Sequence, residues 1–181
     1  MEIITLPNPI LKRKSNPIDK VDNKIKTLMD KMLATMYKAP GIGLAAPQVG
    51  INKRLIVIDT SPRPGLKRYQ EEKIEKKKEI KPNPIQMVNP EIIWVSEKKE
   101  KDSEGCLSIP GFNEIISRPD KIELTWQDLS GKQHKDYPEG LLTVCIQHEI
   151  DHLEGKLMVD YVSALKRDRV RKRLLKEFNR K

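Results

Sequence analysis

The sequence predicts an α+β fold, in which small mixed or antiparallel sheets pack around a central helix. Apolar residues recur at helical spacing near both ends of the chain, whereas the middle carries the alternating or short apolar runs that are typical of strands. The apolar run 141–153 also has helical spacing, and its composition favours a buried helix. The chain has 181 residues, which suits one compact core, so we expect residues 1–181 to form a single domain.

The first predicted element is a helix over residues 22–38, which Pro40 and Gly41 end. Its apolar side chains share one helical face; they are Ile25, Leu28, Met29, Met32, Leu33 and Met36. A turn of small residues follows at 41–48, and the apolar run 54–59 predicts a strand.

Residues 62–84 interrupt this pattern. The segment carries prolines at 62, 64, 82 and 84 around a middle that is rich in Lys and Glu and nearly free of apolar residues. Such a composition provides little to bury, so we expect an exposed insertion with no catalytic part.

Strands resume after the insertion, at 87–88, 92–95, 121–126 and, beyond a turn at Ser130–Gly131, around 135–137. The central helix is expected from Leu141 to Leu153, between Gly140 and Gly155. A last helix runs from about Ala164 to Phe178, within the basic C-terminal segment 164–181.

The formal net charge of +9 is concentrated at the end of the chain. Residues 166–181 contain nine Lys or Arg and two acidic residues, so they carry +7 and leave +2 for the rest. A segment of this kind binds nucleic acid in some proteins and is a solvated helix face in others, and composition alone favours the second reading. No run approaches the ~18 apolar residues of a membrane span, and no signal peptide begins the chain, so we expect a cytoplasmic protein without a membrane partner.

The chemistry of the chain centres on the helical motif His148-Glu-Ile-Asp-His152. Residues four apart project from one face of a helix, so both imidazoles can bind one metal ion. Glu149 lies beside them, where it can take a proton from the water that a divalent ion activates. Two surface histidines in chance register would be the structural explanation, but the apolar neighbours of this motif predict a buried helix.

A tetrahedral catalytic site needs a third protein ligand. The His-Glu-x-x-His-x-x-Gly-x-x-His pattern of zinc proteases fails at Met158, and Glu177 lies on the charged tail without a supporting motif. Cys145 is seven residues from His152, about 10 Å along the helix, and reads better as a buried residue.

His134 is expected at the surface of a hairpin. Cys106 follows Gly105 in a polar segment; alone it would read as an ordinary thiol, but together with the helix motif it is the preferred third ligand.

Three segments, taken in order, resemble the signature motifs of the peptide deformylases: 41–48 (GIGLAAPQ), 104–108 (EGCLS) and 147–152 (QHEIDH). The resemblance extends over nearly the whole chain. It implies an enzyme that removes the formyl group from the N-terminal formyl-methionine of new polypeptides and releases formate. It further implies one divalent ion per chain, physiologically Fe²⁺, for which Zn²⁺, Ni²⁺ or Co²⁺ can substitute.

Carried over by position, the resemblance implies Cys106, His148 and His152 as metal ligands and Glu149 as general acid and base. Gln48 and the backbone N–H of Leu107 match the groups that stabilise the oxyanion, and Gly43 is implied to lie beside the substrate. For the methionine pocket, the apolar residues Ile42, Ile109, Val144 and Cys145 are the candidates.

The implied partners are N-formylmethionyl nascent polypeptides and the ribosome near its exit tunnel, where the basic C-terminal helix can dock. Two rival readings remain. An ordinary endopeptidase would share the ion and Glu149 but would cleave internal peptide bonds. A ribosome- or RNA-associated protein without catalysis would use the basic segment 166–181 and keep the helix motif as structure only.

Overall fold

The computed structural model describes residues 1–62, 66 and 81–178. Its strands are β1 (Gly43–Ala45), β2 (Leu55–Ile58), β3 (Ile85–Val95), β4 (Lys99–Gly105), β5 (Asn113–Pro119), β6 (Ile122–Gln127) and β7 (Gln133–Asp136). Its α-helices are α1 (Asn23–Lys38), α2 (Gly140–Leu153) and α3 (Ala164–Phe178). Short 3-10 turns lie at η1 (Pro9–Lys12), η2 (Ala46–Val49) and η4 (Met158–Tyr161).

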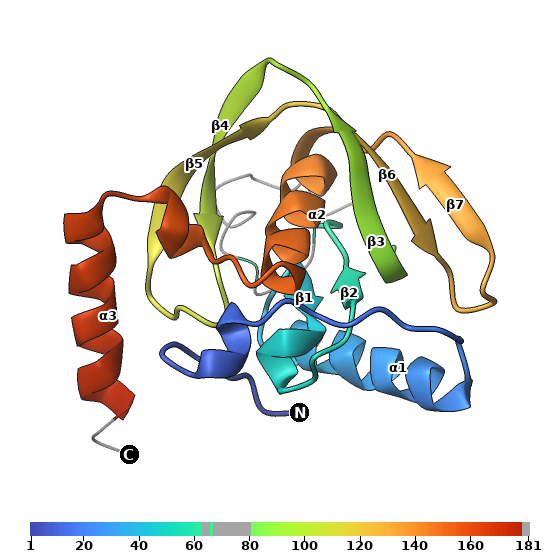
Figure 1. Ribbon diagram of the computed structural model, residues 1–181, viewed down its shortest axis with the longest axis horizontal. Helices are drawn as coiled ribbons and strands as arrows, with labels where there is room; N and C mark the ends of the chain where they lie inside the picture. Colours follow the sequence, from blue (N-terminus) through green and yellow to red (C-terminus); the bar gives the residue numbers. More distant parts are fainter. Residues whose placement is uncertain (63–65, 67–80, 179–181) are drawn as a thin grey trace.

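The strands form two antiparallel sheets around α2. The larger sheet has the order β1-β2-β3-β6-β7, and the smaller one is the β4–β5 hairpin. In Figure 1, α2 lies in the centre, with both sheets arching over it and α1 beneath. The prediction of an α+β fold with antiparallel sheets around a central helix is confirmed.

Helix α1 begins and packs as its sequence predicts. The Asp22 side chain accepts a hydrogen bond from the Ile25 N–H at 2.9 Å, which satisfies one of the free donors of the first turn. The buried face of the helix packs against the sheet in one apolar cluster with Leu44, Leu55 and Val57. Helical spacing alone therefore identified the face that α1 buries.

The β4–β5 hairpin was not predicted. Strand β4 reads Lys-Glu-Lys-Asp-Ser-Glu-Gly, and only Glu104 in it is buried. Its register with β5 runs without a break from Lys99 opposite Pro119 to Gly105 opposite Asn113. Backbone pairing and a few inward-facing side chains, not an apolar stripe, hold this strand, so hydrophobic alternation could not reveal it.

Helix α3 is docked on the body of the protein through one narrow face (Figure 1). Val170 and Leu174 are buried in an apolar cluster that also contains Ile109 and Leu157. The Arg173 guanidinium donates to the backbone carbonyls of Pro110 at 2.7 Å and Gly111 at 3.1 Å. The predicted basic helix thus contributes to the core as well as to the surface.

Most of the predicted insertion, at 63–65 and 67–80, lies outside the described residues. Residues 81–84 are exposed as expected, whereas Leu66 is buried. Within residues 1–62, 66 and 81–178, no helix combines the length and apolar character that crossing a membrane requires.

The end of α2 depends on Gly155, and this dependence can be tested by substitution. Gly155 has φ +70°, and an added Cβ would lie 2.6 Å from the Lys12 carbonyl oxygen. Gly131 has φ +85° with no atom within 4 Å of an added Cβ. Both alanine variants incur the left-handed backbone cost of about 1–2 kcal/mol, but only Gly155→Ala adds the clash, about 1–3 kcal/mol more.

The free energies of unfolding of Gly155→Ala and Gly131→Ala in urea measure this difference directly. Equal losses in the two variants would show that the α2 end tolerates a side chain at position 155.

Candidate metal centre

Helix α2 presents both histidines of its motif to the interior. His148 and His152 are buried, with 8% and 1% of their surface exposed, and their ring centroids are 5.1 Å apart. Their spacing of four residues puts them on one helical face. The face points towards the segment that follows β4.

Cys106 comes directly after β4 and meets this face. Its Sγ lies 3.3 Å from Nε2 of His152. The ligand atoms of Cys106, His148 and His152 all lie within 4.8 Å of one another, which is close enough for one metal ion to bind all three. Among the described residues, no other group of His, Cys, Asp or Glu meets this condition.

The other ligand candidates lie elsewhere. His134 stacks on Trp126, with centroids 4.5 Å apart, and contacts Asp128 at 2.7 Å. Cys145 is buried, and its Sγ lies 3.6 Å from the Ile42 carbonyl oxygen. Met158 is buried in the cluster beneath α3, and Glu177 lies at the far end of that helix.

The environment of the three side chains suits a metal ion. Glu149 Oε2 and His152 Nδ1 are buried polar atoms without a hydrogen-bond partner among the described residues, an arrangement that costs free energy unless a cation or a water compensates. Burial and the neighbouring His148 hold the pKa of His152 well below its usual range, so this imidazole is neutral and free to bind a cation. One thiolate and two imidazoles form a donor set that suits Fe²⁺, Zn²⁺, Ni²⁺ or Co²⁺ better than Mg²⁺ or Ca²⁺.

Glu104 orients His148. Its Oε2 lies 2.8 Å from His148 Nδ1, and its two oxygens accept from Arg118 Nε at 2.5 Å and Nη2 at 2.9 Å. Burial alone would raise the pKa of Glu104, but the hydrogen bonds from His148 and Arg118 outweigh it and the pKa is lowered. Because an ionised carboxylate only accepts, Nδ1 of His148 carries its proton towards Glu104 and Nε2 remains for a ligand.

Sequence reasoning missed Glu104 and Arg118 as parts of the site. Glu104 was read only as the first residue of its motif, and Arg118 was not singled out. The one available signal was the position of Glu104 two residues before Cys106, since nothing in the pattern of β5 marks Arg118 as buried.

Gln48 lies in η2 against the same centre. It is 1% exposed, and its Oε1 accepts from the Ala45 N–H at 2.7 Å. That bond turns Nε2 towards Cys106 Sγ at 3.6 Å and Ser108 Oγ at 3.2 Å. An amide donor therefore lies beside the thiol, and Leu107 follows that thiol in the chain.

Glu149 and Gly43 are in direct contact. A Cβ added at Gly43 would lie 2.3 Å from Glu149 Oε1, so only glycine leaves room for the carboxylate. Burial raises the pKa of Glu149 to about 7, which is the range in which a carboxyl group can both take and give a proton at neutral pH.

The structure separates the apolar pocket candidates into two groups. Ile42 and Cys145 belong to the cluster around α2. Val144 lines a recess of about 160 Å³ between the β4–β5 hairpin and the start of α2. Ile109 is fully buried in the cluster beneath α3, so it is not brought together with the other three.

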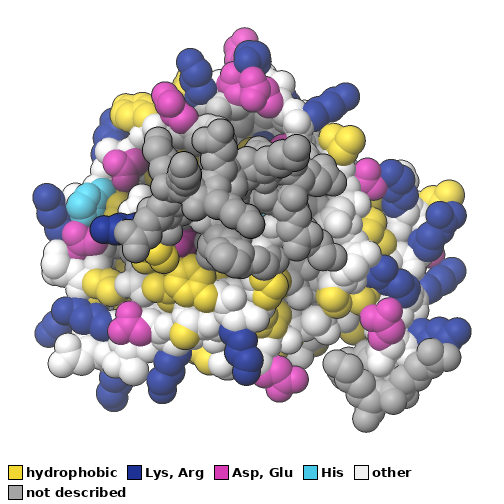
Figure 2. Space-filling model, turned by 180° about the vertical axis from the view of Figure 1, so that it is seen from behind, with side chains coloured by type: hydrophobic (Ala, Val, Ile, Leu, Met, Phe, Trp, Pro, Cys, Tyr) yellow, Lys and Arg dark blue, Asp and Glu magenta, His cyan; other side chains and the backbone are white. Residues whose placement is uncertain are grey.

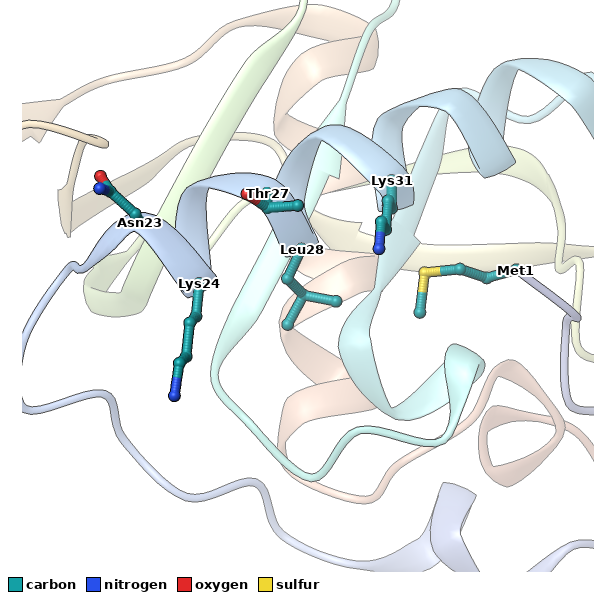
Figure 3. A pocket seen from close by; sticks show the side chains of 6 residues that line it. All are labelled: Met1, Asn23, Lys24, Thr27, Leu28 and Lys31. Carbon is teal, nitrogen blue, oxygen red and sulfur yellow. The ribbon is translucent and has the colours of Figure 1, made fainter.

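A larger groove lies away from this centre, between Met1 and α1 (Figure 3). Its volume is about 500 Å³, and Lys24, Leu28 and Lys31 line it. None of the candidate site residues contributes to it.

Comparison with known proteins gives one consistent result. The family model described as "Polypeptide deformylase" matches residues 1–168. A peptide deformylase of Bradyrhizobium diazoefficiens is 48% identical over 179 residues, which cover 99% of this chain and 97% of the relative. That of Phenylobacterium zucineum is 46% identical over 175 residues, covering 97% and 95%.

Solved structures agree with the sequence comparison. The crystal structure of a peptide deformylase from Ehrlichia chaffeensis superposes with a TM-score of 0.83 at 38% identity, covering 98% of this chain and 96% of that one. The complex of an Ehrlichia chaffeensis deformylase with actinonin gives a TM-score of 0.84 at 37% identity, with the same coverage. On the matched sequence, the shared fold and the motifs that converge on one centre, the chain belongs to the polypeptide deformylase family.

Proposed function

We propose that this enzyme removes the formyl group from the N-terminal formyl-methionine of newly made polypeptides and releases formate, with a divalent metal ion held by Cys106, His148 and His152. The observation that carries the proposal is the convergence of these three donors within 4.8 Å, in a chain whose relatives are deformylases. The buried Glu149 and the Gln48 amide beside them supply the remaining groups that hydrolysis of a formamide needs.

A metal ion at this centre acts as a Lewis acid, which lowers the pKa of water from ~15.7 towards ~7 and polarises a carbonyl. Glu149 takes the proton of the water that attacks the formyl carbon and passes it to the leaving amine. Its burial supports this role, because a pKa of about 7 allows both transfers at neutral pH.

Negative charge develops on the formyl oxygen as water attacks. The Nε2–H of Gln48 and the backbone N–H of Leu107 stabilise that charge. Gln48 is suited to this because its Oε1 is held by the Ala45 N–H, so the amide needs no reorganisation. Gly43 confines the Glu149 carboxylate, since any side chain there would displace it.

We further propose Fe²⁺ as the physiological ion, with Zn²⁺, Ni²⁺ or Co²⁺ as substitutes, and residues 1–181 as one catalytic unit. The sulfur and nitrogen donors support this set of metals. For the methionine side chain, Ile42, Val144 and Cys145 remain the supported candidates, because they line or adjoin the face of α2 that carries the motif.

We propose nascent formylated chains at the ribosomal exit as substrates, with the cytoplasm as the place of action and α3 as the docking element. Lys and Arg side chains project along the edge of the molecule on which α3 lies (right in Figure 2). Arg169, Arg171 and Lys176 are exposed on it, while Val170 and Leu174 keep it attached to the core.

The reaction itself is tested with formyl-Met-Ala beside acetyl-Met-Ala and unformylated longer peptides. We expect stoichiometric formate from the first and no turnover of the others, because a larger acyl group or an internal bond lacks the small formyl carbon. Release of internal fragments without formate would instead identify the rival endopeptidase activity.

The third ligand is tested with Cys106→Ser, using Cys145→Ser as the matched control. A hydroxyl is a poor ligand for these metals, so metal affinity should fall by more than the roughly 10–100-fold that loss of an outer partner costs. The control removes a buried thiol that lies outside the triad and should retain its metal. Metal analysis of anaerobically purified protein decides; equal metal content in the two variants would exclude Cys106.

The docking role of α3 is tested by changing Arg169, Arg171 and Lys176 together to Gln. These substitutions leave the buried residues and Arg173 intact, unlike a truncation after Leu165, which would remove Val170 and Leu174 from the core. We expect weaker ribosome binding with a salt dependence reduced by about 0.7–0.9 per lost phosphate contact, and unchanged turnover of formyl-Met-Ala. Unaltered ribosome affinity across salt concentrations would argue against docking through α3.

A further inference from the structure

Asp151, inside the helical motif, joins a chain of contacts that ends at the metal centre. Its Oδ2 accepts from Arg118 Nη1 at 2.8 Å and from the Tyr161 hydroxyl at 2.8 Å. Tyr161 is the last residue of η4, so the chain after α2 returns to touch this helix. Asp151 therefore links β5, α2 and η4 at one carboxylate oxygen.

Arg118 connects Asp151 to Glu104. The guanidinium is buried, binds Glu104 through Nε and Nη2, and uses Nη1 for Asp151. Its Cζ also lies 5.1 Å from the centroid of the Tyr161 ring. With Glu104 on His148 Nδ1, the contacts run without a gap from Tyr161 through Asp151, Arg118 and Glu104 to His148.

Two physical effects follow from this arrangement. Two carboxylates share one guanidinium, so Glu104 keeps more of its negative charge for His148 than it would in an exclusive pair with Arg118. Asp151 and the Tyr161 ring also fix the plane of the guanidinium, and that plane sets where the Glu104 oxygens lie. Both effects strengthen the hydrogen bond to His148 Nδ1, which raises the donor strength of Nε2.

We propose that Asp151 and Tyr161 are positioning residues for the metal site, which hold Arg118 so that Glu104 stays aligned with His148. The proposal rests on the proposed function in assigning His148 as a ligand. Neither residue touches the ligand atoms of the centre: both act through Arg118 and Glu104.

The experiment measures Zn²⁺ affinity of metal-depleted protein by competition with a chelator. Asp151→Asn keeps the size of the side chain and removes its charge, and we expect Zn²⁺ to bind about 10-fold more weakly. Tyr161→Phe keeps the ring over Arg118 and removes the hydroxyl, so its shift has the same direction and is smaller. Tyr137→Phe is the matched control, because that exposed tyrosine meets Glu123 and not Arg118.

A double-mutant cycle separates positioning from general stability. In a Glu104→Gln background the route to His148 is cut, so Asp151→Asn should change Zn²⁺ affinity by no more than about twofold. The unfolding free energy of each metal-free variant is measured in parallel.

Full Zn²⁺ affinity in Asp151→Asn, or an undiminished effect of Asp151→Asn in the Glu104→Gln background, would overturn the proposal. Formate release by the unchanged enzyme reports on the proposed function separately. A failure there, with the affinity shifts as expected, would leave the positioning role standing.

Discussion

The buried ion pair between Arg118 and Glu104 determines how the β4–β5 hairpin lies on α2. Both side chains are 5% exposed, and neither charge has a route to water that would replace its partner. Breaking such a pair by removing one member costs about 3–5 kcal/mol, because the other charge stays buried. Glu104 is two residues before Cys106, so the same pair that fastens the hairpin also brings the thiol to the two histidines of α2.

The parts of the fold that follow from periodicity could be predicted from the sequence. The α1 stripe, the apolar run of β2, the alternation of β6 and the helical spacing of α2 each describe one buried face, and the structure has each of them at the expected residues within one or two positions. Strands β4 and β5 escaped because their inward residues include Glu104 and Arg118, whose charges cancel only in three dimensions. Strand β1 is three residues long, too short for any period to be visible.

The site divides along the same line. His148 and His152 are legible because a helix converts a spacing of four into a shared face. Cys106 gained its place only in combination with them and with the resemblance to the deformylases. Ile109 was grouped with Ile42 and Val144 because an apolar residue next to a motif indicates burial, but apolar character does not say in which cluster the residue is buried. The partners of Arg118 are invisible for a related reason: a charged residue gives no sign of which opposite charge it will meet.

The position of Cys106 also has a consequence for the folding equilibrium. Cys106 and His152 are 46 residues apart in the chain and come from different elements. An ion bound by both would act as a cross-link closing that loop, much as a disulfide would. By the chain-entropy estimate for a covalent bridge of this length, the unfolded ensemble would lose about 4 kcal/mol of conformational freedom at 25 °C. The three donors of the reaction centre would thus also be a fastener between hairpin and helix, with catalysis and topology sharing the same atoms.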